Sequence, residues 1–419
     1  MSGALWPSPW PAEDGGPRRL QVPAPAGTGW GLQPGARLAV THREAPGTTM
    51  VVLRDPGQVY VLRHGFGDDA VAWVEQIDPL SLEVLARSPD LPGGPMWPGG
   101  LAAHADGTLH VVFGNHAHRL AADTSVLAST ALPRARPYNS FVTLPDGHLV
   151  TKDFAGLRPG QADTGREPAE LLVLDSASLA VVARLEVPEP SIARLSADGD
   201  DVYVVGDTSL LRARWDGSAL ALDRDFVAPY RTMPGQTYGW DAVLALGAAW
   251  FLDDGEGTHR FNGSFRDQGI STAPLHVVRV DLVTAAVTLT EVCGLPGGLI
   301  ANPPLVDEER RIVVGFDSGN GAMTAFDVAE DGGLTPRWRR QQDHASHLLL
   351  LPETGELISG DHDRARMADQ AVVLDITTGE ELARVDTGSP LQSVVFPAPG
   401  WHDDVYVCSM STLTRVTPA

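Results

Sequence analysis

Lysine is almost absent from this sequence. Of its 31 basic residues only Lys152 is a lysine, and all the others are arginines. Lysine is a compact point charge whose pKa falls readily when the side chain is buried, which suits it to proton transfer or imine chemistry. The place of Lys152 in the fold therefore decides whether it is a functional group or a remnant of a genome that prefers arginine codons.

Positive charge is scarce in general. The chain has 53 acidic residues and a formal net charge of -22 at pH 7. Nucleic acids and anionic membrane surfaces both require a basic footprint on the protein that binds them. We therefore expect no nucleic-acid partner and no membrane partner.

Long apolar runs and closely spaced cysteines are also lacking. No segment approaches the roughly 18 apolar residues of a membrane span, and the N-terminal sequence does not read as a secretory signal. Cys293 and Cys408 lie far apart in the sequence. The Gly-x-Ser-x-Gly elbow, the P-loop and the dinucleotide fingerprint are missing, so serine-hydrolase, NTPase and NAD chemistry are not expected. The sequence predicts a cytoplasmic protein with free thiols.

One motif, repeated eight times, makes up most of the chain. It is an apolar run, a tight turn that often contains Asp-Gly, and a β-branched run, as in "SFVTLPDGHLVTKDF" from Ser140 and "IARLSADGDDVYVVGDT" from Ile192. A second strand pair lies between copies, and four antiparallel strands per repeat are typical of a propeller blade. We predict an all-β fold: residues 1–35 form an N-terminal extension and residues 36–419 form a single β-propeller, with eight blades favoured and seven possible. The strand Ala36–Thr41 would close the ring by completing the last blade.

The Asp-Gly hairpins and the segment "RPYNS" around Asn139 resemble the gluconolactonase and strictosidine-synthase-like families. The resemblance implies the propeller architecture. In those families an asparagine after a proline, near the start of an inner strand, lines a central metal site, and Asn139 matches this one feature.

Propeller topology places the segments before each first strand and after each second strand on one face, here called the mouth face. The Asp-Gly turns lie on the opposite face, here called the turn face, so we expect His104 and His148 to lie away from the mouth face. Lys152 aligns with positions that are apolar or glycine in the other repeats: Leu62, Val112, Gly206, Leu252, Phe316 and Gly360. A buried ammonium must be paired or neutralised. Lys152 therefore either has a lowered pKa or forms an ion pair between blades.

Aspartates recur one position later, at Asp153, Asp207, Asp253, Asp317 and Asp361. They could cap the turns that follow the strands, or they could form a ring of carboxylates around a cation. Histidines are a second group of mouth-face candidates: His64, His116, His118, His344, His347 and His362. Imidazoles from several blades could hold a transition metal, or could make ordinary hydrogen bonds at strand ends.

Aromatic residues complete the mouth face: Trp97, Tyr138, Phe154, Tyr238 and Trp240. They could line a pocket for a largely apolar organic molecule, or they could pack between blades.

The sequence favours an enzyme that acts on a small, largely apolar metabolite by acid/base chemistry, of the isomerase, lyase or cyclase type. Lys152, Asp153 and His344 are the candidate catalytic groups. The candidate substrate-binding residues are Trp97, Tyr138, Asn139, Trp240, Asp241, His347 and His362. No cofactor is favoured, and a divalent metal is possible.

Two alternatives stay open. One is a metal-dependent lactonase or hydrolase at the same site, with Asn139, Asp317, Asp361 and the histidines as ligand candidates. The other is a propeller that binds a ligand or a protein without catalysis. Eight blades would also suit a pyrroloquinoline-quinone dehydrogenase, although such enzymes are usually exported. The substrate and the oligomeric state are not indicated by the sequence.

Overall fold

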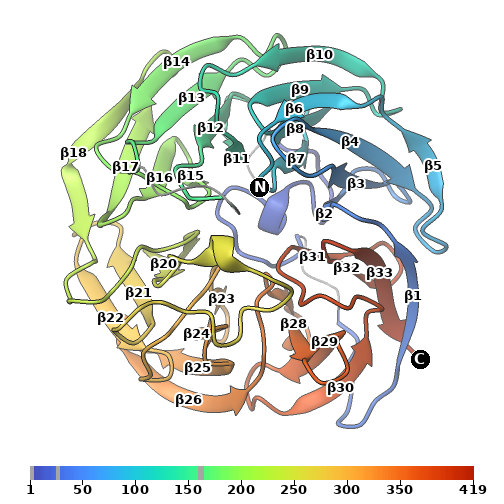
Figure 1. Ribbon diagram of the computed structural model, residues 1–419, viewed down its shortest axis with the longest axis vertical. Coiled ribbons are helices and arrows are strands. Elements are labelled where there is room, and N and C mark those ends of the chain that lie inside the picture. The colour runs from blue at the N-terminus through green and yellow to red at the C-terminus, as the bar shows by residue number, and fades with distance from the viewer. Residues whose placement is uncertain (1–3, 25–28, 159–164) are drawn as a thin grey trace.

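The structure is a computed structural model that describes residues 4–24, 29–158 and 165–419. Eight antiparallel sheets are arranged in a ring around a central channel (Figure 1). Each sheet has four strands in a row, and the first carries an additional short strand, β6, against β4. The prediction of an eight-bladed all-β propeller is confirmed. No helix among these residues is long and apolar enough to cross a membrane.

The strands of the first four blades have the following bounds. Blade 1 contains β2 (Thr48–Leu53), β3 (Val59–His64), β4 (Ala70–Ile77), β5 (Val84–Arg87) and β6 (Leu91–Gly94); blade 2 contains β7 (Gly100–Ala103), β8 (Leu109–Phe113), β9 (His116–Leu120) and β10 (Val126–Ala131); blade 3 contains β11 (Tyr138–Thr143), β12 (Leu149–Asp153), β13 (Glu170–Leu174) and β14 (Val181–Glu186); blade 4 contains β15 (Ser196–Asp198), β16 (Asp201–Val205), β17 (Ser209–Trp215) and β18 (Leu220–Pro229).

The second half of the ring has the same organisation. Blade 5 contains β19 (Val243–Ala245), β20 (Ala248–Leu252), β21 (His276–Asp281) and β22 (Val287–Glu291); blade 6 contains β23 (Leu305–Asp307), β24 (Ile312–Asp317), β25 (Ala322–Val328) and β26 (Leu334–Gln341); blade 7 contains β27 (Leu349–Leu351), β28 (Glu356–Asp363), β29 (Ala368–Asp375) and β30 (Glu381–Asp386); blade 8 contains β31 (Pro397–Pro399), β32 (Val405–Cys408), β33 (Thr412–Pro418) and β1 (Leu38–Glu44). Two 3-10 turns, η1 (Glu13–Gly15) and η2 (Thr258–Arg260), complete the elements.

Burial explains why the inner and outer strands differ in sequence. The inner strands β2 and β12 are buried along their whole length because neighbouring blades cover both faces. Strand β2 accordingly ends in an apolar run, whereas β12 carries Lys152 and Asp153 at its end. The outermost strands β10 and β14 alternate between exposed and half-buried residues. The hairpin turns use glycine where the backbone has a positive φ, as at Gly107 (87°) and Gly147 (94°).

Both ends of the chain contribute to blade 8. Strand β1 pairs with β33 in antiparallel register, from Leu38 opposite Pro418 to Glu44 opposite Thr412. The closing strand lies slightly later in the sequence than the expected Ala36–Thr41. The N-terminal strand thereby covers the edge of β33, which would otherwise be free.

Residues 4–24 run through the central channel, and η1 lies near the centre of the ring (Figure 1). Backbone carbonyls of this channel segment accept hydrogen bonds from inner-strand amides of five blades: Trp10 from Leu53 (2.8 Å), Pro11 from Ala103 (2.7 Å), Pro17 from Ala197 (2.8 Å), Arg18 from Leu244 (2.9 Å) and Gln21 from Leu350 (2.9 Å). Inner strands have a free edge toward the channel, and buried amides need acceptors. Residues 4–24 of the segment assigned to an N-terminal extension therefore lie inside the ring.

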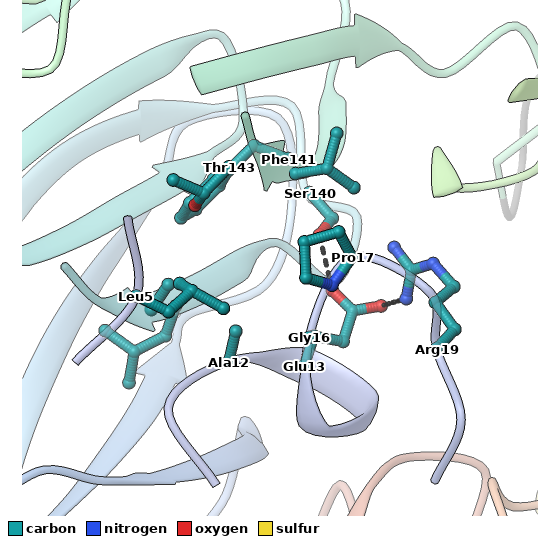
Figure 2. A pocket seen from close by; sticks show the side chains of 12 residues that line it. Leu5, Ala12, Glu13, Gly16, Pro17, Arg19, Ser140, Phe141 and Thr143 are labelled. Atoms are coloured by element: carbon teal, nitrogen blue, oxygen red, sulfur yellow. Dashed lines mark hydrogen bonds and ion pairs between the residues drawn. The ribbon is translucent and has the colours of Figure 1, made fainter. Parts of the chain in front are cut away.

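A buried group of charged residues anchors the channel segment. Arg19 forms ion pairs with Glu13 and with Asp14 (3.0 Å), and all three side chains are at most 5% exposed. Glu13 also accepts a hydrogen bond from Ser140 and pairs with Arg194 (3.0 Å). Figure 2 shows Glu13 between Ser140 and Arg19, beside a cavity of about 10 Å³. Opposite charges thus compensate one another where water is excluded.

We predict that Arg19→Gln destabilises the protein much more than Arg18→Gln. Arg19→Gln leaves the buried carboxylates short of a cation, which should lower the free energy of unfolding by about 3 kcal/mol or more. Arg18 pairs with Glu308 at the surface, where both side chains are more than a third exposed, so its loss should cost at most about 1 kcal/mol. Urea denaturation of both variants measures the difference. Equal losses would show that the buried charge group does not hold the channel segment in place.

Candidate functional site

Lys152 is buried near the mouth-face end of β12, with a relative exposure of 1%. Its Nζ donates hydrogen bonds to two backbone carbonyls, of Asp153 (2.9 Å) and of Ser191 (3.0 Å), the second in the segment that leads into blade 4. No carboxylate of the described residues is within ion-pair distance of Nζ. Lys152 thus bridges two blades without forming an ion pair.

The contacts of Lys152 fit the neutral amine better than the ammonium. A neutral amine has two N–H groups and a lone pair, whereas an ammonium has three N–H groups to satisfy. Two carbonyl acceptors therefore satisfy every N–H of the neutral form. Burial lowers the pKa of Lys152 to about 7, against the opposing charges of Asp153 and Asp241.

Asp153 does not direct its carboxylate to Lys152. Its carboxylate binds Arg136 and Arg134 (3.1 Å) and accepts a hydrogen bond from the backbone N–H of Glu170 (2.6 Å). Three of the aligned aspartates also accept backbone N–H groups, Asp253 from His276 (2.6 Å), Asp317 from Asn320 (3.0 Å) and Asp361 from Asp343 (2.9 Å). The Asp317 bond caps a turn, whereas the bonds of Asp253 and Asp361 join segments distant in the sequence, so each carboxylate is engaged by its own surroundings.

A cavity of about 690 Å³ opens on the mouth face over blade 3. Three arginines line it, Arg136, Arg158 and Arg166, and Glu167 is the one acidic residue among the described lining residues. Ala155 also lines the cavity, and its N–H donates to the Ser191 carbonyl that accepts from Lys152 (3.1 Å). Lys152 therefore lies just beneath the cavity floor.

Arg166 is held firmly at the cavity wall. Its Nε donates to the Ala155 carbonyl (2.7 Å), its Nη1 pairs with Asp207 (2.5 Å), and its guanidinium lies over the Tyr238 ring, 4.2 Å from the centroid. Its Nη2 is buried and has no hydrogen-bond partner among the described residues. Nη2 is therefore a buried donor at the cavity wall that the described residues leave unsatisfied.

An aromatic stack adjoins the same cavity. Phe154 lines the cavity and stacks on Trp97 with centroids 4.0 Å apart and planes 17° apart. The ring centroid of Trp240 lies 6.4 Å from that of Trp97. The indole N–H groups of both tryptophans are buried without a partner within the described part of the chain. Two of the expected substrate-binding residues thus lie beside this cavity.

Tyr138, Asn139 and Asp241 have other partners. The hydroxyl of Tyr138 accepts from the backbone N–H of Arg134 (3.2 Å), and the Asn139 amide donates to the Ile192 carbonyl of blade 4 (2.8 Å). Asp241 accepts the backbone N–H of Arg194 (2.6 Å) and pairs with its guanidinium (3.4 Å). These three residues tie blades together or belong to the charged group of the channel.

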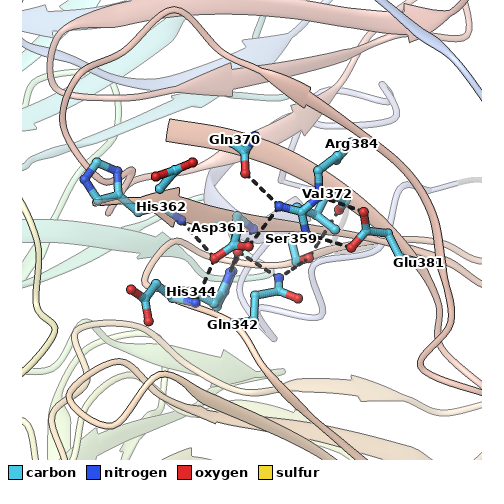
Figure 3. Close-up of polar contacts among 12 residues, drawn as sticks. Gln342, His344, Ser359, Asp361, His362, Gln370, Val372, Glu381 and Arg384 are labelled. Carbon is cyan, nitrogen blue, oxygen red and sulfur yellow. Dashed lines mark hydrogen bonds and ion pairs between the residues drawn. The ribbon is translucent and has the colours of Figure 1, made fainter. Parts of the chain in front are cut away.

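Three of the candidate histidines, His344, His347 and His362, come from blade 7 and do not line the cavity. His344 Nδ1 accepts from the Gly360 N–H (2.9 Å), and burial lowers the pKa of His344 to about 4, so it is neutral. His347 lies 2.8 Å from Asp14 of the channel segment. Figure 3 shows the His362 ring apart from that of His344. In the described part of the chain, one group of side chains could hold a metal ion, and it lies on the turn face: His104, Asp106 and His110.

The sequence analysis did not single out the arginines of the cavity or the charges of the channel segment. The repeat topology does place residues 134–137 and 154–158 on the mouth face. Arginine is so frequent in this chain that no single one stands out. The segment "EDGGPRR" has no repeat to align with, so nothing in the sequence indicates that it enters the channel.

We predict a pH-dependent stability that disappears in Lys152→Met. In the unfolded chain Lys152 has an ordinary pKa of about 10.4, whereas in the fold it is about 7. Between these values the unfolded state holds a proton that the folded state has released. The contribution of Lys152 to the free energy of unfolding should therefore rise with pH, by up to about 1.4 kcal/mol per pH unit. Urea denaturation from about pH 7 to about pH 10 tests this, and parallel profiles for the two proteins would contradict a lowered pKa.

Comparison with known proteins supports the fold. No family model matches the chain, and no curated protein is matched. A europium-containing methanol dehydrogenase has a TM-score of 0.60 and 10% identity over 96% of this chain and 89% of its own. BamB from Moraxella catarrhalis has a TM-score of 0.55 and 12% identity over 90% of this chain and 100% of its own. The computationally designed Ika8 protein has a TM-score of 0.52 and 12% identity over 94% of this chain and 100% of its own. At these identities the likeness is one of fold, and the resemblance to gluconolactonase and strictosidine-synthase-like proteins is supported for the propeller architecture only.

Proposed function

We propose that the protein binds a small organic anion in the mouth-face cavity over blade 3. The observation that carries this proposal is the presence of three arginines, Arg136, Arg158 and Arg166, around one cavity of an otherwise strongly acidic protein. Guanidinium groups present paired donors that match carboxylate and phosphate oxygens. The ligand is therefore more polar than the sequence analysis expected.

The size and walls of the cavity narrow the class of ligand. Its volume of about 690 Å³ suits a small metabolite. Phe154, backed by Trp97, provides a flat apolar wall for an unsaturated or aromatic body. Each guanidinium already has an acidic partner, and the Nη2 atom of Arg166 is a donor without a hydrogen-bond partner among the described residues. An aromatic or unsaturated carboxylate or phosphate would use both the apolar wall at Phe154 and the guanidinium donors.

We predict that Arg166→Gln weakens anion binding and that Arg364→Gln does not. Calorimetric titration with phthalate, succinate and inorganic phosphate should show binding, with phthalate tightest because its ring can lie against Phe154. Losing a hydrogen bond to a charged group should weaken the affinity about tenfold or more in Arg166→Gln. Arg364, in the turn between β28 and β29 of blade 7, is half-exposed and pairs with the exposed Asp267, so it is a matched control. An equal effect of both substitutions, or no binding of any probe, would refute the anion site.

A second candidate function is acid/base catalysis by Lys152 on the bound anion, of the isomerase, lyase or cyclase type. The specific observation in its favour is that the two carbonyls satisfy the neutral amine and leave its lone pair unused. Such catalysis requires the ligand to reach Nζ beneath Ala155. The metal-dependent lactonase alternative gains no support from Asn139, Asp317 or Asp361, because their polar atoms have local protein partners.

Labelling of the single lysine tests access to Nζ. The Lys152 lone pair can attack an aldehyde carbon and form an imine with release of water, and cyanoborohydride then supplies the hydride that gives a secondary amine. We predict that glyoxylate, which is anionic, labels Lys152 faster than the neutral glycolaldehyde, and that Arg166→Gln removes the difference. Peptide mass mapping separates Lys152 from the N-terminal amine. Labelling of the N-terminal amine alone would exclude catalysis by Lys152 and leave the anion site to the binding test.

A further inference from the structure

The turn between β7 and β8 in blade 2 gathers three side chains with metal-ligating atoms. In the sequence "HADGTLH", His104 follows β7, Asp106 lies in the turn and His110 lies in β8. One ligand atom from each lies within 4.8 Å of the others. The two imidazoles are nearly fully buried and meet edge-on with centroids 5.2 Å apart, whereas Asp106 is exposed. The group lies on the turn face, away from the arginine cavity.

Hydrogen bonds define which nitrogen of each ring carries the proton. His104 Nε2 lies 3.2 Å from the Gly147 carbonyl, to which it donates. The Thr108 hydroxyl donates its single hydrogen to Asp106 Oδ1 (2.6 Å), so it accepts from His110 Nε2 at 3.2 Å. Both rings therefore carry their proton on Nε2, and both Nδ1 atoms have a free lone pair.

These lone pairs are poorly compensated by protein atoms. His104 Nδ1 accepts a long hydrogen bond from the Asp106 N–H (3.3 Å) and also lies 3.0 Å from the Asp106 carboxylate oxygen Oδ1, which repels it. His110 Nδ1 is buried and has no partner in the described part of the chain. A proton on His104 would compensate the contact with the Asp106 carboxylate but would leave His110 Nδ1 without a partner. A cation shared by the three side chains would compensate both sites.

We propose that His104, Asp106 and His110 bind a divalent first-row metal ion of the zinc class through one nitrogen of each ring and one carboxylate oxygen. Two imidazole nitrogens and one carboxylate oxygen suit such an ion, and the exposed side of Asp106 leaves a fourth position for water. The Nε2 bonds to the Gly147 carbonyl and to Thr108 are the outer contacts that orient metal-bound histidines. Arg119 binds the other oxygen of Asp106, Oδ2 (2.9 Å), and its charge lowers the affinity for a cation.

Metal titration of the full-length chain tests the site. Wild-type protein stripped of metal should bind one Zn²⁺ per chain, and Co²⁺ should give the visible absorption of a low-coordinate nitrogen and oxygen site. His110→Gln should weaken Zn²⁺ binding at least tenfold and abolish the Co²⁺ spectrum. His148→Gln is the matched control, because His148 and Asp146 form the same contact (3.0 Å) in the turn of blade 3 without a second histidine. Equal Zn²⁺ binding by His110→Gln, or no binding by the wild type, would overturn the proposal.

A measurement on the wild-type chain keeps the test valid if His110→Gln does not fold. Nitrogen NMR of labelled histidine reports the protonation of each ring atom. We expect His104 and His110 to carry protons on Nε2 alone and both Nδ1 signals to shift when Zn²⁺ is added. A doubly protonated His104 ring that does not respond to Zn²⁺ would show that a proton occupies the place of the metal.

Discussion

The structure depends on how residues 4–24 and strand β1 close the ring. The inner strands of the propeller leave backbone amides facing the channel, and the channel segment accepts hydrogen bonds from five of the eight blades. Strand β1 then completes blade 8 at the outside of the ring. The same stretch of chain thus satisfies the inner edge and the outer edge, and the buried charges around Arg19 fix its position.

This closure determines where a ligand can enter. Asp241 pairs with Arg194, and His347 lies beside Asp14 of the channel segment. These polar side chains therefore belong to the charged group inside the ring. The cavity on the mouth face lies over blade 3. There the connecting segments before β11 and after β12 supply arginines, and Lys152 lies beneath them. Function is therefore proposed for the segments that vary between blades, whereas the repeated positions form the packed ring.

The repeat pattern was sufficient to predict the blades, because strands buried on both faces are apolar and hairpin turns contain Asp-Gly or similar residues in each copy. It also placed Lys152 at a buried position near the mouth face, where the structure describes it. The pattern could not predict the direction of single side chains at strand ends: Asp153 turns to Arg134 and Arg136, and His344 of blade 7 packs against Phe316 of blade 6. Residues outside the repeat, such as Glu13 and Arg19, have no aligned position from which their contacts could be derived.

The central claim is that an anion site lies directly above a lysine with a lowered pKa. Because the chain has one lysine, carbon-13 labelling of lysine gives a single side-chain NMR signal that needs no assignment. The account predicts that this signal titrates near pH 7 in the free protein and at a higher pH with phthalate bound, since a nearby anion stabilises the ammonium. A signal that titrates near the ordinary value of about 10.4, or one that phthalate leaves unchanged, would contradict it.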